Sequence, residues 1–144
     1  MASRRKGRIL AFQALYSWEA NKASIDDVAS LSWLEEEGQL DDKTRTFARF
    51  LITGTIENIS DIDRMIKDHL KNWALSRLNR VDLALLRLSV FTLMFQQEIA
   101  PSIVIDEAIG ISREYGTDDS FRFINGVLDS IKKTLQESGK QDVS

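Results

Sequence analysis

The segment that most constrains this fold is 79–97, where apolar side chains cover nearly every face of a helical pattern. One face carries Val81, Ala84, Leu85, Leu88, Phe91 and Phe95, and other faces carry Leu86, Val90 and Leu93. A helix that is apolar all round must be surrounded by other elements, whereas a surface helix has a single apolar stripe. We therefore expect this helix at the centre of a helical bundle.

The segment 4–21 has a similarly broad apolar surface, and only Gln13 and Ser17 mark a clear polar strip. It predicts a second central helix, which exposes its basic first turn. A third helix, which starts near Asp41 and Asp42, carries Phe47, Phe50, Leu51 and Ile52. Further boundary signals are Ser24 with Asp27, Ser60 with Asp63, Pro101, Gly116, and Thr117 or Asp118.

Helices separated by short connections predict an all-α fold of two small bundles packed into one compact domain. The chain has 144 residues and one proline, which suits a single domain with few helix breakers. We place the domain at 1–136, with an N-terminal bundle at about 4–59 and a C-terminal bundle at about 60–136. Residues 137–144 are expected to form a flexible tail.

Charge is distributed unevenly along the chain. The net charge is only -3, but residues 1–10 hold Arg4, Arg5, Lys6 and Arg8 without an acid. Residues 19–42 hold eight acidic residues against one basic residue, Lys22. Such a distribution can present a local basic patch on an acidic protein.

The residue types needed for common catalytic and metal sites are scarce. Cysteine is absent and His69 is the single histidine, so the usual zinc sites are excluded. We see no phosphate-cradling glycine loop and no nucleophile–histidine arrangement, and we expect neither enzyme activity nor a cofactor. Without a signal peptide or an apolar run of about 20 residues, a cytoplasmic protein that does not enter membranes is the default expectation.

Five segments, in order along the chain, resemble the NusB family of transcription antitermination factors. They are RILAFQALYSW (8–18), RLNRVDLALLR (77–87), IDEAI (105–109), YGTDDS (115–120) and FINGVLD (123–129). The resemblance implies two three-helix bundles and binding to single-stranded boxA RNA in ribosomal RNA transcription. It also implies partnership with NusE, a small-subunit ribosomal protein, within the transcription elongation complex, and a homodimer is possible.

The resemblance implies that the basic start contacts RNA through Arg4, Arg5, Lys6 and Arg8. Lysine and arginine neutralise phosphates and release counterions, which supplies affinity for any RNA sequence. Arginine can also stack on bases. The alternative is a solvated tail that only aids solubility.

At the start of the last helix, Phe123 lies about 100° from the apolar stripe centred on Ile124. Beside Arg122 it could stack a base, although packing against a neighbouring helix is the alternative. Phe121 lies nearer the stripe and is expected to serve the core. Asp119 matches a family acid near RNA, and its carboxylate could accept hydrogen bonds from base amines.

The family also has aromatic residues near the RNA at the positions of Tyr16 and Tyr115, although both could be core tyrosines with satisfied hydroxyls. Asp82 matches a family acid that faces NusE, and its alternative role is an ion pair with Arg80. Arg87 interrupts an apolar run and is expected to form a structural salt bridge, with Asp106 or Glu107 as candidate partners.

Two other functions remain open at this stage. The chain could be a helical protein–protein interaction scaffold without intrinsic RNA binding, in which case the basic start is incidental. It could also be the regulatory module of an RNA-modifying enzyme that acts in trans. Titration with short single-stranded RNA at two salt concentrations separates the first alternative from an RNA-binding factor.

Overall fold

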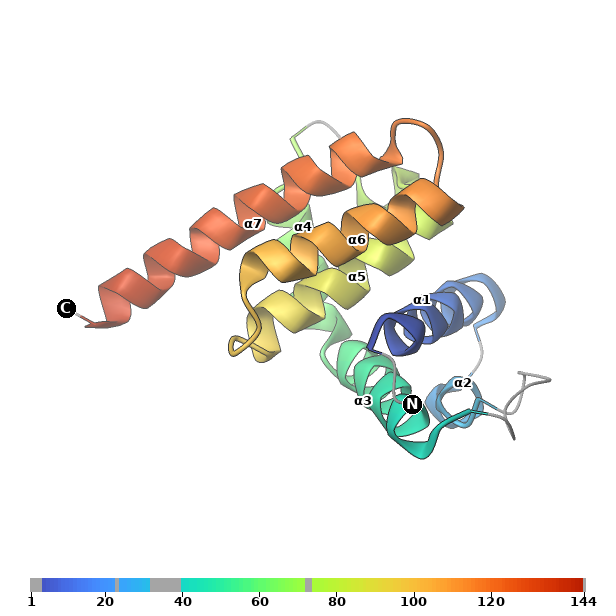
Figure 1. Ribbon diagram of the computed structural model, residues 1–144. Helices are drawn as coiled ribbons and strands as arrows, with labels where there is room; N and C mark the ends of the chain where they lie inside the picture. The colour runs from blue at the N-terminus through green and yellow to red at the C-terminus, as the bar shows by residue number, and fades with distance from the viewer. Residues whose placement is uncertain (1–3, 23, 32–39, 72–73, 144) are drawn as a thin grey trace.

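A computed structural model describes residues 4–22, 24–31, 40–71 and 74–143, with side chains up to residue 138. Every regular element in these ranges is helical, which confirms the predicted all-α fold (Figure 1). The elements are α1 (Arg4–Asn21), α2 (Ile25–Ala29), α3 (Asp42–Glu57), α4 (Ile59–Asp68), the 3-10 turn η2 (Leu75–Arg77), α5 (Arg80–Phe95), α6 (Pro101–Tyr115) and α7 (Ser120–Val143). No helix among them is long and apolar enough to cross a membrane.

The central position of α5 is confirmed. Every residue from Asp82 to Leu93 is buried, and α1, α3, α4, α6 and α7 all pack against this helix. Figure 1 shows α6 and α7 beside α5 on one side of the molecule, and α1, α2 and α3 grouped on the other. Because both groups contact α5, the buried apolar residues form one continuous cluster.

Local capping signals account for several helix starts. The Ser24 hydroxyl accepts the backbone N–H of Asp27 at 3.2 Å and opens α2. Asp41 accepts the backbone N–H of Lys43 at 2.8 Å and opens α3. These carboxylate and hydroxyl oxygens satisfy N–H groups that lack a partner in the first helical turn.

The predicted capping box of Ser60 and Asp63 is wrong. Helix α4 begins at Ile59 after Asn58, whose side chain makes no capping hydrogen bond. Ser60 therefore lies within the first turn, and the Asp63 carboxylate instead binds Arg87 on α5. A paired guanidinium is a stronger hydrogen-bond donor for a carboxylate than a backbone N–H, so the tertiary contact prevails.

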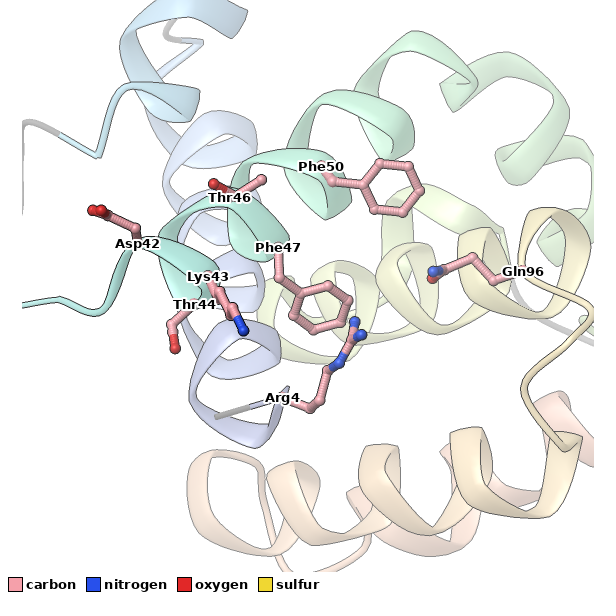
Figure 2. A pocket seen from close by; sticks show the side chains of 8 residues that line it. All are labelled: Arg4, Asp42, Lys43, Thr44, Thr46, Phe47, Phe50 and Gln96. Atoms are coloured by element: carbon pink, nitrogen blue, oxygen red, sulfur yellow. The ribbon is translucent and has the colours of Figure 1, made fainter. Parts of the chain in front are cut away.

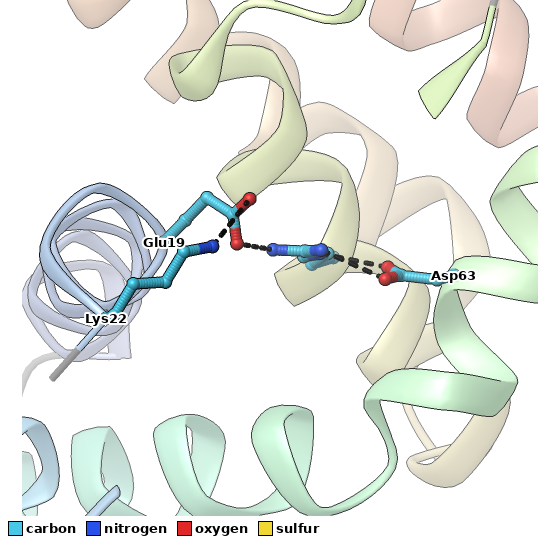
Figure 3. A network of polar contacts seen from close by, with 4 residues as sticks. Glu19, Lys22 and Asp63 are labelled. Atoms are coloured by element: carbon cyan, nitrogen blue, oxygen red, sulfur yellow. Dashed lines mark hydrogen bonds and ion pairs between the residues drawn. The ribbon is translucent and has the colours of Figure 1, made fainter. Parts of the chain in front are cut away.

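Arg87 makes the predicted buried salt bridge, but not with Asp106 or Glu107. Its Nε and Nη2 atoms donate to the two Asp63 oxygens, each at 2.9 Å, and Nη1 donates to Glu19 at 3.0 Å (Figure 3). Burial alone would lower the pKa of Arg87, but the Asp63 and Glu19 carboxylates raise it, and the pKa lies above its ordinary value. This network joins α1, α4 and α5.

The last helix continues past the predicted domain end. Helix α7 includes residues 137–143, where the sequence predicted a tail, and its end extends beyond the other helices (Figure 1). Glu137, Lys140 and Gln141 favour helices, and no proline interrupts them. The residue types of this segment are therefore compatible with a continuing helix.

Candidate nucleic-acid interface

The basic start of the chain is part of a packed helix rather than a tail. Arg4, Arg5 and Lys6 are exposed in the first turn of α1, and Arg8 is half-buried. Gly7, between them, is buried against Phe47 of α3, and a Cβ at Gly7 would lie 2.6 Å from the Phe47 ring. This close approach of α1 to α3 fixes the direction in which the basic side chains leave the surface.

Two of these arginines share one aromatic ring. The guanidinium carbon of Arg4 lies 4.4 Å from the centroid of Phe47, and that of Arg8 lies 5.6 Å from it. Burial and the neighbouring Arg4 lower the pKa of Arg8, while Glu107 of α6 partly offsets the shift. Contacts between cations and aromatic faces hold the guanidinium groups in place without neutralising them.

Arg5 extends across α1 toward α6. A terminal nitrogen of its guanidinium lies 2.9 Å from the place that a Cβ on Gly110 would occupy. The absence of a side chain at Gly110 therefore leaves the space that Arg5 uses. Arg5, Arg8, Phe12 and Tyr16 follow each other at three- and four-residue intervals, so they share one face of α1.

We call this face, together with Glu107, Gly110 and Tyr115 of α6, the α1–α6 seam. The rings of Phe12 and Tyr115 pack across it with centroids 5.4 Å apart and planes inclined at 52°. Phe12 is buried, whereas Tyr16 and Tyr115 are both exposed. The seam thus combines arginine side chains with accessible tyrosine rings, which are the groups that bind phosphates and stack bases.

A second cation–aromatic group lies where α6 leads into α7. The guanidinium groups of Arg113 and Arg122 lie 4.8 Å and 5.4 Å from the centroid of Phe121. Helix α7 begins at Ser120, so the exposed residue Asp119 directly precedes it. The helix thus begins later than the predicted cap at Thr117 or Asp118. The Thr117 backbone N–H donates a hydrogen bond to the Ser120 hydroxyl at 3.0 Å.

The predicted difference between Phe121 and Phe123 is wrong. Both rings are half-buried, but Phe123 packs against the apolar core and Phe121 does not belong to it. Phe123 also lines a cavity of about 530 Å³ with His69 and Lys71, which follow α4. Angles on an isolated helix cannot reveal which neighbours pack against each flank, and the tertiary packing places Phe123 rather than Phe121 against the core.

Asp82 is buried, with only 6% of its surface exposed. Its backbone N–H donates to Asn79 Oδ1 at 2.8 Å, and the Asn79 amide donates to its carboxylate at 3.0 Å. Burial raises the pKa of Asp82, and hydrogen bonds from Ser120 and Asn79 offset part of the shift. The predicted alternative, an ion pair with Arg80, is replaced by this capping pair. Asp82 thus supports the start of α5 and offers little surface to a partner.

The structure brings Arg5, Arg8 and Tyr115 together at the α1–α6 seam, with Tyr16 on the same face of α1, and it places Asp119 and Arg122 at the start of α7. Sequence reasoning missed the role of Phe47, whose ring holds Arg4 and Arg8, and it missed Arg113, which lies against Phe121 together with Arg122. A signal for Arg113 was its place one helical turn after Gly110 and just before Gly116. Within the described part of the chain, no three His, Cys, Asp or Glu side chains gather to hold a metal ion.

The model of the NusB family matches residues 5–133. Transcription antitermination protein NusB of Treponema denticola is 51% identical over 129 residues, which cover 90% of this chain and 95% of that protein. A structure of T. maritima NusB superposes with a TM-score of 0.83 at 38% identity, covering 92% of this chain and 93% of that one.

A crystal structure of antitermination factors NusB and NusE in complex with dsRNA is also similar. Its matching chain has a TM-score of 0.83 and 27% identity, and the match covers 91% of this chain and 96% of that one.

Proposed function

The chain belongs to the NusB family, and from this premise we propose that it is an RNA-binding transcription antitermination factor. In this proposal it binds boxA-type single-stranded RNA together with NusE and supports ribosomal RNA transcription. It acts by binding within the elongation complex in the bacterial cytoplasm, and it performs no catalysis. The observation that carries the proposal is the ordered basic first turn of α1, held against the aromatic ring of Phe47.

The phosphate backbone is assigned to the start of α1. Arg5 and Arg8 lie along the α1–α6 seam, and Arg4 and Lys6 extend the positive charge to either side. Each phosphate contact releases counterions, so affinity should fall as salt rises. The acidic residues of the segment 19–42 oppose binding away from this path, whereas Glu107, which lies within the seam beside Arg8, weakens the positive charge locally.

The bases are assigned to the aromatic rings that follow. Tyr16 and Tyr115 offer exposed rings beside the arginines. Arg122 and Asp119 flank the start of α7, where Asp119 can accept a hydrogen bond from a base amine. Phe123 contributes from the wall of its cavity, and Phe121, which has two guanidinium groups near its ring and does not belong to the core, is a second stacking candidate.

The partner proposal rests on the related structure that contains NusB, NusE and dsRNA. Because Asp82 is buried, we assign it an indirect part: it holds the start of α5 in the form that a partner would recognise. A homodimer of the free protein is a further possibility within the proposal. Sedimentation with and without RNA tests whether RNA competes with self-association.

The decisive experiment is a filter-binding titration with boxA RNA, a scrambled RNA of equal length and a dsRNA, each at two salt concentrations. Preference for single-stranded boxA and a steep salt dependence are expected. Arg5→Ala should lower the salt slope by about 0.7, because one phosphate contact is lost. Arg64→Ala, an exposed arginine on α4 outside the interface, is the matched control and should leave the slope unchanged. Weak, salt-insensitive binding beside intact NusE binding would favour the interaction scaffold.

A further inference from the structure

A cleft of about 580 Å³ opens between the first turn of α1, the outer face of α3 and the end of α5 (Figure 2). Arg4 and Lys43 lie at its edges, and Phe47, Phe50 and Gln96 line it. The volume falls in the range of pockets that bind small organic groups. The cleft lies on the α3 side of α1, so it is distinct from the α1–α6 seam.

Phe50 gives the cleft an exposed aromatic wall. The sequence placed this residue among the apolar side chains of α3, but 50% of its surface is accessible. Its ring meets Phe91 edge to face with centroids 5.7 Å apart, which holds the ring while leaving it open to the cleft. Phe47 stands beside it and has the Arg4 guanidinium over its face.

Gln96 supplies an unsatisfied polar group in the same place. Only 8% of its surface is exposed, and its Oε1 has no hydrogen-bond partner among the described residues. Figure 2 shows the amide end of Gln96 turned toward Phe47, Phe50 and Arg4. A buried acceptor without a donor is unfavourable. Because Oε1 itself has almost no accessible surface, a turn of the Gln96 side chain toward the cleft would let a ligand N–H satisfy it.

We propose that this cleft binds one nucleobase of single-stranded RNA, at the point where the strand continues past the first turn of α1. The base stacks on Phe50, one of its N–H groups donates to Gln96, and the adjoining phosphate lies near Arg4 and Lys43. The inference rests on the proposed function, because the same strand must occupy the α1–α6 seam. It adds a base-binding position that uses α3 and the end of α5.

The combination of groups favours a nucleotide over an apolar peptide side chain. An aliphatic or phenyl group would cover Phe50 but leave the Gln96 oxygen without a donor. A nucleobase has a flat face, N–H groups at its edge and an attached phosphate, and each has a counterpart here. Asp42 also lines the cleft, but its carboxylate is paired with Arg45 at 3.4 Å, so it repels a phosphate less than a free carboxylate would.

The test compares a short boxA RNA with RNAs extended by several nucleotides at either end. The wild-type chain should bind one extended RNA more tightly than the short one. Phe50→Ala should weaken binding of that extended RNA by about 5- to 150-fold, the range for one lost stacked base. Gln96→Leu should act in the same direction. Neither variant should change the affinity for short RNA, and Phe50→Ala should leave the salt slope unaltered because it removes no charge.

Phe95→Ala is the matched control. Phe95 is nearly as exposed as Phe50, its ring centroid lies 5.5 Å from that of Phe91, and it does not line the cleft. Thermal melts check that all three variants fold. If wild-type protein binds no RNA, the proposed function fails first. If it binds but Phe50→Ala and Gln96→Leu retain full affinity for every extended RNA, this inference alone is overturned. Equal losses with Phe95→Ala, or weaker binding of NusE with RNA affinity intact, would also overturn it.

Discussion

Replacing Arg87 with methionine should destabilise the protein more than any change at an exposed ion pair. The substitution keeps most of the volume and the contact with Trp18, whose ring centroid lies 5.7 Å from the guanidinium carbon, but it removes the charge. Asp63 and Glu19 then lose three hydrogen bonds of 2.9–3.0 Å. The carboxylates are left in place on α4 and α1, on opposite sides of the missing cation.

The magnitude follows from how far these carboxylates are buried. Breaking a fully buried ion pair from one side costs about 3–5 kcal/mol. The Asp63 and Glu19 side chains retain 22% and 28% of their exposure, so water relieves part of that penalty. We therefore expect a loss of about 2–4 kcal/mol in unfolding free energy, measured by urea denaturation at neutral pH.

Lys22→Ala provides the control within the same network. Lys22 reaches Glu19 at 3.9 Å and its side chain is 80% exposed, so this pair should contribute at most about 1 kcal/mol (Figure 3). Adding Asp63→Asn to the Arg87 variant should recover part of the loss, because one unpaired charge disappears. If Arg87→Met costs no more than Lys22→Ala, the network does not hold α1, α4 and α5 together.

Three further predictions concern the site and its supports. Phe123→Ala should reduce the unfolding free energy by about 2 kcal/mol, half of the loss for a fully buried phenylalanine, whereas Phe121→Ala should mainly weaken RNA binding. A urea melt and an RNA titration of both variants test this, and the reversed pattern would contradict it. Because burial raises the pKa of Asp82, the charged carboxylate opposes folding at pH values above the ordinary carboxyl pKa. Asp82→Asn should therefore raise the unfolding free energy more at pH 7 than at pH 4, and equal changes in unfolding free energy at both pH values would contradict this cause. Gly110→Ala should stabilise the protein by up to about 1 kcal/mol, because alanine favours a helix more than glycine does and the flexible end of Arg5 can move aside. A loss of stability in a thermal melt would mean that Arg5 cannot move away from the new Cβ.

Part of the candidate interface could be predicted from residue types and their order in the sequence. The basic start of the chain, Tyr16 and Tyr115 could be selected by type and by family resemblance, and the structure places Arg5, Arg8 and both tyrosines along the α1–α6 seam. The exposed cleft beside Phe50 could not be selected in this way. Its aromatic residue has the same type and spacing as a core residue, and only the position of the neighbouring helices leaves it uncovered.

Sequence alone determined the features that arise within one segment. Apolar side chains on every face required a central α5, and Ser24 and Asp41 marked helix starts, because periodicity and capping act over a few neighbouring residues. Tertiary structure decided the features that depend on which helix covers which flank. Arg87 pairs with Glu19 from 68 positions away, and Phe123 packs against the apolar core while Phe121 does not belong to it. Burial at these positions is set by distant partners, which the local pattern of a helix does not specify.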